Sequence, residues 1–458
     1  MTKKFLVYLI AGGLSVQMTS AQQDSASIEK SLENNKQQIE EISGKIGGLE
    51  ESYLETKATV DKLKKIKFSG YLQAQIRTSI DTTGQLKSDY TNNYDIGEFQ
   101  GGKLPAATKS VFQVRRARLK AAYETDLTQM VIQLDCLPFT TSGTSLAGGG
   151  VSVKDAYLRF SEPWLKSISL KLGIFDRPFG YEISYSSSTR ESPERSRLFQ
   201  TLFPGERDMG FSLEYQAGDN LPDWARYLNF KGGMFAANGI NIEYDDLRDY
   251  IGRLGFSIPL ADVNVSIEGG LSGYFGNVKS RNDSLYETKN KTWTLTRGNK
   301  WSDIDRQYLG GDLELFYGNI PAFGGVCLRG EVIQGQQPGT SGSSGSPKSD
   351  QAIKSPLYLR NFSGYYGMLV LNVDPIKCQL VGKYDSYDPN TDLSGNSVKS
   401  NSDLSYSTVG CGLIYHWDEN VKLMAYYDNV TNETTTANAL FNKDLNDDVF
   451  TFRIQYKF

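Results

Sequence analysis

The residues most able to do chemistry in this sequence are arginines and lysines that recur at every second position. Arg116, Arg118 and Lys120 alternate with small or apolar residues, and Arg115 directly precedes the series. Guanidinium and ammonium groups bind carboxylates, phosphates and other anions through charge-assisted hydrogen bonds. Because successive side chains of a strand point to opposite faces, this spacing places three cationic groups on one face. The pattern predicts a strand whose polar face attracts anions.

Other residue types offer little for catalysis or for a metal site. His416 is the single histidine, which excludes sites built on several histidines. The cysteines Cys136, Cys327, Cys378 and Cys411 lack the short spacing of a metal motif, although Cys378 and Cys411 could face each other on neighbouring strands. We predict no catalytic residues, no metal and no cofactor. The net charge of -4 argues against a nucleic-acid partner, which requires clustered bases.

The first residues have the three zones of a cleavable secretory signal. Lys3 and Lys4 precede an apolar stretch, and small residues follow up to Ala21. The stretch is too short to cross a bilayer as a helix. We therefore assign residues 1–21 to a signal peptide and expect export across an inner membrane.

A heptad repeat follows, between residues 28 and 63. Its a positions hold Leu32, Ile39, Ile46, Tyr53 and Val60, and its d positions hold Ile28, Asn35, Ile42, Leu49, Thr56 and Leu63. This repeat is the seam of a coiled coil, and isoleucine at both positions shifts the preference toward three or more strands. We predict a coiled-coil helix over residues 24–66 that joins a homotrimer. A lone solvated helix or linker is the alternative.

Residues 67–458 predict an all-β transmembrane barrel of about sixteen antiparallel strands. No apolar run there is long enough for a membrane-spanning helix, whereas segments of about ten residues alternate in polarity with period two. In the last segment Phe450, Phe452 and Ile454 share one face, and Arg453 lies on the other. The expected strands are 67–79, 110–123, 128–136, 151–161, 167–175, 207–216, 225–236, 249–258, 262–275, 305–317, 322–335, 357–372, 375–386, 404–416, 420–429 and 447–458.

The connections between these strands alternate between short and long. Brief turns such as 124–127 and 373–374 alternate with long polar segments such as 276–304 and 336–356. Outer-membrane barrels have short periplasmic turns and long external loops. With an even number of strands, both chain ends and the coiled coil lie in the periplasm, and the barrel lies in the lipid of a bacterial outer membrane.

The surrounding lipid assigns the two faces of each strand. An Arg or Lys on the lipid face costs about 2–4 kcal/mol at mid-depth, so charged side chains are expected to point inward. Besides Arg116, Arg118 and Lys120, the inward bases are Arg77, Arg159, Lys171, Lys231, Arg253, Arg329, Lys377, Lys383, Lys422, Arg453 and Lys457. The inward acids are Asp135, Asp155, Glu214, Glu268, Asp312, Glu314, Glu331, Asp385 and Asp428. Arg115 breaks the alternation, which predicts a bulge or a position at the rim.

Because the inward bases outnumber the inward acids, we expect a modest preference for anions in a water-filled pore. The alternative is that these charges pair with one another and have no role in selectivity.

The third long loop, Asp176–Glu206, is expected to fold inward and narrow the channel. It mixes aromatic residues with charged groups able to pair with the barrel wall, namely Arg177, Glu182, Arg190, Glu191, Glu194, Arg195 and Arg197. The alternative is an ordinary external loop.

At these residues the chain resembles the phosphate-selective porin O and P family of bacterial outer membranes. The resemblance is carried by the segments 112–119, 172–182, 194–196 and 207–210, and it covers residues 66–458. It implies a sixteen-stranded trimeric porin for small anionic or hydrophilic solutes. It also implies that the paired arginines Arg115 and Arg116 contribute to the basic lining of the pore.

Two rival classes remain. One is an exported β-rich hydrolase with paired carboxylates such as Asp312 and Glu314, although a ladder of charges in the lumen explains these two residues more simply. The other is a plugged outer-membrane barrel that acts as a receptor, adhesin or structural protein. Electrical current through a bilayer distinguishes the channel from the plugged barrel.

Overall fold

The computed structural model describes residues 25–79, 97–104, 108–136, 150–217, 221–241, 243, 245–321, 323–347 and 353–458. Contacts within the chain divide it into two units, residues 1–64 and residues 65–458. The predicted signal peptide, residues 1–21, lies outside the described residues.

The first unit contains one described helix, α2 (Ser25–Leu63), where the heptad predicts it. Its apolar seam is exposed: the exposed fractions of Ile39, Leu49 and Tyr53 are 59%, 69% and 65%. Such a seam gains stability when it is buried against a second helix. The helix is confirmed, whereas the coiled coil and the number of chains in it stay predictions. In the described residues no helix is long and apolar enough to cross a membrane.

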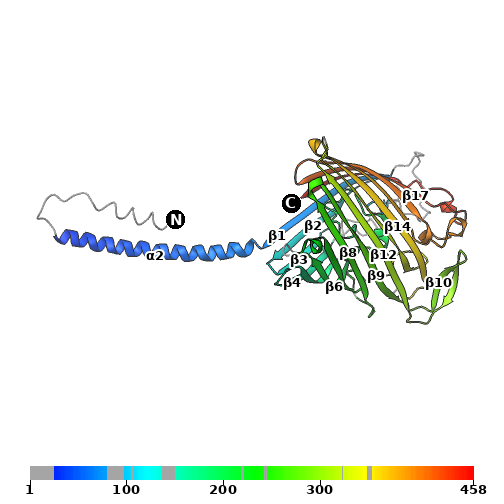
Figure 1. The fold of residues 1–458 in the computed structure, drawn as a ribbon, viewed down its shortest axis with the longest axis horizontal. Coiled ribbons are helices and arrows are strands. Elements are labelled where there is room, and N and C mark those ends of the chain that lie inside the picture. The colour runs from blue at the N-terminus through cyan, green and yellow to red at the C-terminus, as the bar shows by residue number, and fades with distance from the viewer. Residues whose placement is uncertain are drawn as a thin grey trace. The chain divides into compact units, whose positions relative to one another are not determined.

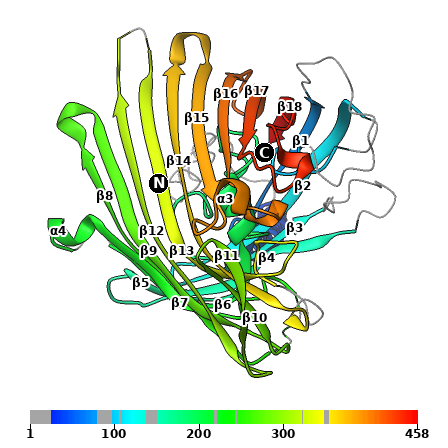
Figure 2. The same ribbon diagram turned by 90° about the vertical axis from the view of Figure 1, so that its right-hand side faces the viewer.

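Sixteen strands of the second unit form a closed antiparallel barrel (Figures 1 and 2). Each strand pairs with the next along the chain, and β1 pairs with β18, beside which it lies in Figure 2. The barrel strands are β1 (Ile66–Ser79), β2 (Ser110–Glu124), β3 (Thr128–Asp135), β4 (Ser152–Ser161), β5 (Ile168–Asp176), β6 (Arg207–Gln216), β7 (Leu228–Phe235), β8 (Asp249–Leu260), β9 (Val265–Lys279), β12 (Asp303–Gly318), β13 (Gly325–Gly339), β14 (Leu357–Val373), β15 (Cys378–Asp388), β16 (Tyr406–His416), β17 (Val421–Asn432) and β18 (Val449–Lys457). Each expected strand is confirmed, with ends shifted by a few residues.

The side chains of each strand alternate between an apolar outer face and a polar inner face. On β13, Leu328 and Val332 are exposed on the outer face, whereas Arg329 and Glu331 are buried on the inner face. Charge therefore points inward, as the alternation in the sequence predicts. Closure of the sheet also removes the unpaired strand edges that a bilayer does not tolerate.

Short turns join the strands at the ends opposite to the long loops. Left-handed residues close several of these turns, among them Lys166 and Asn264, both with φ of 54°. Lys377 has the same φ, directly after the 3₁₀ turn Asp374–Ile376. The expectation that Lys377 points into the lumen is therefore wrong, because β15 begins only at Cys378.

A hairpin that the sequence analysis treats as loop lies between β9 and β12. It consists of β10 (Ser284–Lys289) and β11 (Thr292–Arg297), joined by Asn290 and Lys291 with φ of 50° and 58°. Strand β10 also pairs in parallel with the start of β14. The hairpin was missed because its two strands are short and rich in polar residues.

The four cysteines are free in this structure. Cys378 is opposite Tyr415, and Cys411 is opposite Gly382. The two cysteines therefore lie several positions apart along the ladder between β15 and β16, and they do not form the disulfide that the sequence leaves open.

An arginine placed on the outer face tests the assignment of the two faces. We expect Val332→Arg, near the middle of β13, to lower the free energy of unfolding in vesicles by about 2–4 kcal/mol if lipid surrounds this face. Val332→Leu is the matched control and should unfold like the unaltered protein. Equal stability of the arginine variant would contradict the assignment.

Candidate functional site

The third loop, residues 177–206 between β5 and β6, contacts inward-facing side chains on opposite walls of the barrel. The backbone N–H groups of Tyr181 and Glu182 each donate to the Glu331 carboxylate on β13, at 2.8 Å. The carbonyl of Ser188 accepts from Gln455 on β18 at 2.9 Å. The loop therefore crosses the interior of the barrel from β13 to β18.

One glycine permits the close approach to β13. Gly180 has φ of +59°, and a Cβ at this position would collide with the Glu331 carboxylate. Its N–H donates to the Ser272 hydroxyl on β9 at 2.9 Å. A residue with a side chain would be strained in this conformation and would displace the loop.

Apolar contacts hold the part of the loop that contains the short helix α3 (Arg197–Leu202). Phe199 packs edge-on against Tyr366, with ring centres 6.2 Å apart, and Phe203 packs in the same way against Tyr308 at 5.7 Å. Both phenylalanines are at most 1% exposed. Aromatic pairs of this kind each contribute about 0.5–1.5 kcal/mol beyond the area they bury. The interior of the barrel thus contains an apolar core beneath the loop.

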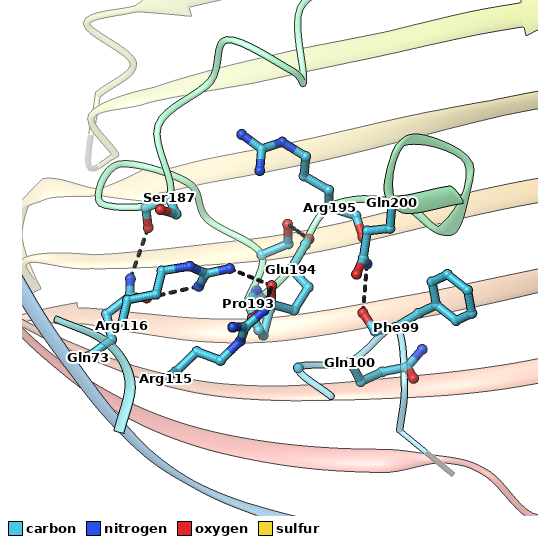
Figure 3. A network of polar contacts seen from close by, with 12 residues as sticks. Gln73, Phe99, Gln100, Arg115, Arg116, Ser187, Pro193, Glu194, Arg195 and Gln200 are labelled. Carbon is cyan, nitrogen blue, oxygen red and sulfur yellow. Dashed lines mark hydrogen bonds and ion pairs between the residues drawn. The ribbon is translucent and has the colours of Figure 1, made fainter. Parts of the chain in front are cut away.

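On the opposite side, the Glu194 carboxylate binds three arginines, of which Arg115 and Arg116 are seen in Figure 3. Arg115 donates from Nε and Nη2 at 2.9 and 3.0 Å, and Arg116 donates from Nη2 at 2.6 Å. Arg453 on β18 donates from Nη2 at 3.0 Å. Charge-assisted bonds of this geometry are about twice as strong as neutral ones. The three arginines anchor the loop to β2 and β18.

A β-bulge allows two consecutive arginines to reach the same carboxylate. Gln73 on β1 is opposite Arg116, whereas Ala74 is opposite Val114, so that Arg115 is the extra residue. A regular strand would point Arg115 outward, but the bulge turns it to the inner face. The bulge that the broken alternation predicts is confirmed.

The arginines also determine the charge of Glu194. Burial alone would raise its pKa, but Arg115, Arg116 and Arg453 lower the pKa well below the usual value for glutamate. The carboxylate is therefore ionised at any physiological pH. Because its pKa is lower in the folded than in the unfolded state, ionisation of Glu194 stabilises the folded loop.

Two more glutamates of the loop pair with the wall. Glu182 accepts from Lys383 on β15 at 2.7 Å. Glu191 accepts from Arg329 on β13 at 3.0 Å and from the hydroxyl of Tyr185 at 2.9 Å. The acids of the loop thus neutralise cations that the sequence assigns to the pore lining.

The remaining basic residues predicted on β1 and β2 are held in different ways. Arg77 donates to the carbonyl of Gly102 at 2.7 Å, in a part of the first loop that folds over it. Arg118 pairs with Asp135 on β3 at 2.9 Å and donates to Ser187 of the third loop at 3.0 Å. Lys120 is half-buried and has no ion pair within the described chain.

The arginines of the third loop mainly hold the loop together. Arg177 pairs with Asp208 at 3.2 Å. Arg195 pairs with Glu206 at 2.5 Å and donates to three carbonyls of its own loop, those of Glu182, Ile183 and Tyr185.

Arg197 differs, because aromatic rings lie directly over its guanidinium group. The group lies 4.1 Å from the ring centre of Phe99 in the first loop and 3.6 Å from that of Tyr406 at the start of β16. Arg190 is 1% exposed, and within the described residues its guanidinium nitrogens have no hydrogen-bond partner.

A polar pocket lies between the edge of the third loop and the wall formed by β5 to β8. The loop contributes Pro178, Gly180 and Ser184. The wall contributes the bases Lys171, Lys231 and Arg253 and the acids Asp176 and Glu214. This is where the loop leaves charged side chains of the wall uncovered.

The three bases of this pocket and Arg159 form a row on β4, β5, β7 and β8. Arg159 on β4 is opposite Lys171 on β5, and Lys231 on β7 is opposite Arg253 on β8. Arg253 pairs with Asp312 at 2.9 Å. Lys231 is exposed, and neither it nor Arg159 has an ion pair within the described residues. Parity turns Lys231 and Arg253 inward, but the sequence does not show that they lie beside the loop.

Lys171 is the most enclosed base of the row. Its ammonium lies 4.4 Å from the ring centre of Tyr157 and 4.5 Å from that of Phe175. Two carboxylates, those of Asp176 and Glu214, lie 3.7 Å away. The row therefore presents a field of mixed sign in which the bases are in excess.

The described part of the interior offers no site for a transition metal or another divalent metal ion. No three His, Cys, Asp or Glu side chains of the described residues are placed to hold a metal ion. His416 lies in β16, and its Nε2 is 3.1 Å from the side-chain oxygen of Gln379. What the arrangement can do is bind and guide ions and small polar solutes.

The barrel resembles solved structures of bacterial outer-membrane proteins. The outer membrane channel DcaP of Acinetobacter baumannii superposes with a TM-score of 0.52 at 12% identity, over 86% of this chain and 97% of DcaP. The chain has the fold of an outer-membrane channel. Pseudomonas putida OprB (TM-score 0.48, 9% identity, 87% of this chain and 96% of OprB) and a loop-deletion mutant of Vibrio cholerae OmpT (0.47, 12%, 86% and 99%) are less similar in structure. No family model and no curated protein matches the sequence.

Removal of one loop carboxylate tests how the third loop is anchored. We expect Glu194→Gln to lower the free energy of unfolding by about 3–5 kcal/mol, because it leaves three buried arginines without their anion. It should also expose the loop to protease. Glu268→Gln is the matched control, since Glu268 faces the interior and accepts a neutral hydrogen bond from Ser257 at 2.9 Å, without an ion pair among the described residues. Equal loss in both variants would contradict the assigned role.

The depressed pKa of Glu194 predicts how the anchor responds to acid. A carboxyl with a lower pKa in the folded state contributes stability above the unfolded value of about 4.3, and the contribution is lost as the pH falls through the folded value. The difference in unfolding free energy between the unaltered protein and Glu194→Gln should stay constant from about pH 8 to about pH 5. A difference that disappears near pH 6 would refute this account.

Proposed function

We propose that the protein is a diffusion channel of the bacterial outer membrane for small hydrophilic solutes, with a modest preference for anions. The observation that carries the proposal is the row of bases Arg159, Lys171, Lys231 and Arg253 beside the edge of the third loop, in which Arg159 and Lys231 have no ion pair within the described residues. Rings of Arg and Lys favour anions in a pore, and nearby acids weaken the preference. Phosphate is one anion of this class.

Because the third loop pairs with the arginines of β2, these arginines are not the main source of the anion preference. Arg115 and Arg116 share one glutamate, and Arg118 pairs with an aspartate. A cation that is paired with an acid contributes little to the electrostatic potential that acts on a passing ion. Selectivity therefore depends on Lys231 and its neighbours more than on the arginine pair that the family resemblance emphasises.

The location and the assembly of the protein form part of the proposal. The apolar outer face fits lipid, and the signal sequence fits export. The exposed seam of α2 fits a trimeric coiled coil in the periplasm, in which each helix buries Ile39, Ile42 and Ile46 against its partners.

A plugged barrel is the second candidate. The wide contact of the third loop with the barrel interior favours it, since three glutamates of this loop pair with the wall. Such a protein would act as a receptor, adhesin or structural protein. It would carry no current.

Recording in planar bilayers tests the channel and its selectivity together. Under a potassium chloride gradient, the zero-current potential of the unaltered protein should indicate an excess of chloride permeability. Lys231→Glu should shift this potential toward cations, because it reverses the uncovered charge. Lys67→Glu, at the start of β1 and paired with Glu124, is the matched control and should not shift the potential. Absence of current identifies the plugged barrel, and an equal shift in both variants refutes the assigned row.

Chemical cross-linking of the native protein tests the coiled coil. We expect species up to three chains, and we expect Ile42→Asp to reduce them at least severalfold because it places a charge in the seam. Lys45→Asp, on the same helix but outside the a and d positions, is the control. Cross-linking that captures only single chains or pairs would contradict the trimer.

A further inference from the structure

A second cavity lies inside the barrel, separate from the pocket beside Lys231. Its volume is about 20 Å³, which is room for about one water-sized particle. The first loop contributes Phe99 and Gln100 to its lining (Figure 3), and the third loop contributes residues 192–195 and Arg197. Inward-facing residues of β15, β16 and β17 complete the lining, and the two cavities have no lining residue in common.

Tyr426 on β17 contributes an unpartnered hydroxyl group to this cavity. The side chain is 1% exposed, and its hydroxyl has no hydrogen-bond partner among the described residues. Tyr426 is opposite Gly412 on β16, and its ring extends along β16 until the hydroxyl lies over Gly410. A Cβ at either glycine would collide with the tyrosine. Because a buried hydroxyl without a partner loses the hydrogen bonds that it makes in water, the site favours an occupant that binds this oxygen.

The hydroxyl lies between two aspartates of neighbouring rows. Gly410 is opposite Asp428 on β17, and the next inward residue of β16, Thr408, is opposite Asp385 on β15. Strands β15 and β17 lie on either side of β16, about 10 Å apart. Because Gly410 has no side chain, the Tyr426 hydroxyl reaches the space between them. Asp385, Thr408 and Asp428 also line the cavity, so four oxygen-bearing side chains from three strands surround one small space.

The charged groups of the lining leave one negative charge in excess. Asp385 and Asp428 have no ion pair within the described residues, although the Asp385 carboxylate accepts from the backbone N–H of Arg197. The guanidinium of Arg197 has no ion pair there either. The other charged residues of the lining bind groups of opposite charge outside it, namely Lys383 to Glu182, Arg195 to Glu206, and Glu194 to three arginines. Two carboxylates are thus balanced by one guanidinium.

We propose that this cavity binds one monovalent cation, Na⁺ or K⁺, through the carboxylates of Asp385 and Asp428 and the hydroxyl of Tyr426. Oxygen atoms replace the hydration shell of such an ion, and a single positive charge balances the excess. A bare ion of this class fits the volume. Two carboxylates are too few for Ca²⁺, which takes about six to eight oxygen ligands, and no third acid, His or Cys of the described residues completes such a site. The ion joins the wall to the first and third loops, away from the row of bases beside Lys231.

Thermal unfolding of the detergent-solubilised protein tests the site. Ionic strength and chloride are held constant while Na⁺ or K⁺ replaces N-methylglucamine, a cation too large for the cavity. At least one of the two ions should raise the unfolding midpoint until the rise saturates, because a ligand that binds only the folded state stabilises it. Asp428→Asn should lose this rise. Glu268→Gln, which removes an inward acid outside the cavity, is the matched control and should keep it. No rise with either ion, or an equal rise in Asp428→Asn, overturns the proposal.

Removal of the Tyr426 hydroxyl separates binding of the ion from folding of the barrel. Tyr426→Phe keeps the ring and the charge, so in N-methylglucamine it should unfold at the midpoint of the unaltered protein. The concentration of Na⁺ or K⁺ that gives half of the rise should increase severalfold, because one ligand is lost. A solely structural hydroxyl would shift the midpoint equally in every salt, which would contradict the proposal.

Two further measurements count the ion and keep it apart from the channel function. Equilibrium dialysis with radioactive sodium or rubidium should give close to one bound ion per chain. Binding that does not saturate would mean that water alone fills the cavity, and would overturn the proposal. The zero-current potential of Tyr426→Phe in potassium chloride should match that of the unaltered protein, so a failure of the channel proposal would appear in the bilayer and not in the dialysis.

Discussion

Backbone groups inside a bilayer have no water to bind, so each N–H and C=O of a spanning strand has to pair with a neighbouring strand. In this chain the ladder between β1 and β18, from Tyr71 opposite Lys457 to Ser79 opposite Val449, completes that pairing. Once the sheet is closed, alternation fixes which side chains face outward and which face inward. The positions of the charges in the interior follow from this closure.

The charge that the interior presents to a solute is not the simple sum of the charged side chains that point inward, because some of them pair with the third loop. The third loop brings Glu182, Glu191 and Glu194 to cations on β2, β13, β15 and β18, and its aromatic residues form an apolar core beneath α3. Both kinds of contact hold the loop to the wall from β12 through β18 to β2. The bases of β4 to β8 remain beside the edge of the loop, where we expect them to attract passing anions.

Much of the barrel is predictable because its signals are local. Alternating polarity identifies each strand, and the break in alternation at Arg115 identifies the bulge. The pairing of the loop with the wall is not local. Nothing in the spacing of Glu194 indicates that it meets Arg453, which is far away in the sequence and adjacent only once β18 has closed on β1.

Errors and omissions have similar causes. The start of β15 was misplaced because alternation continues through the turn that contains Lys377, where only the backbone conformation reveals the end of the ladder. The strands β10 and β11 are joined by a turn whose left-handed residues are Asn290 and Lys291, without the glycine that most often indicates such a turn. Lys231 was assigned to the interior, but its place beside the loop depends on how the loop folds.

Accessibility of the row of bases from the passing solution is the most direct test of this account. With Lys231 replaced by cysteine, a charged thiol reagent added during bilayer recording should reduce the current, and the unaltered protein serves as the control for its four free cysteines. The account predicts a marked and irreversible reduction for this variant alone. An unchanged current would show that solutes take another path, and would contradict the account.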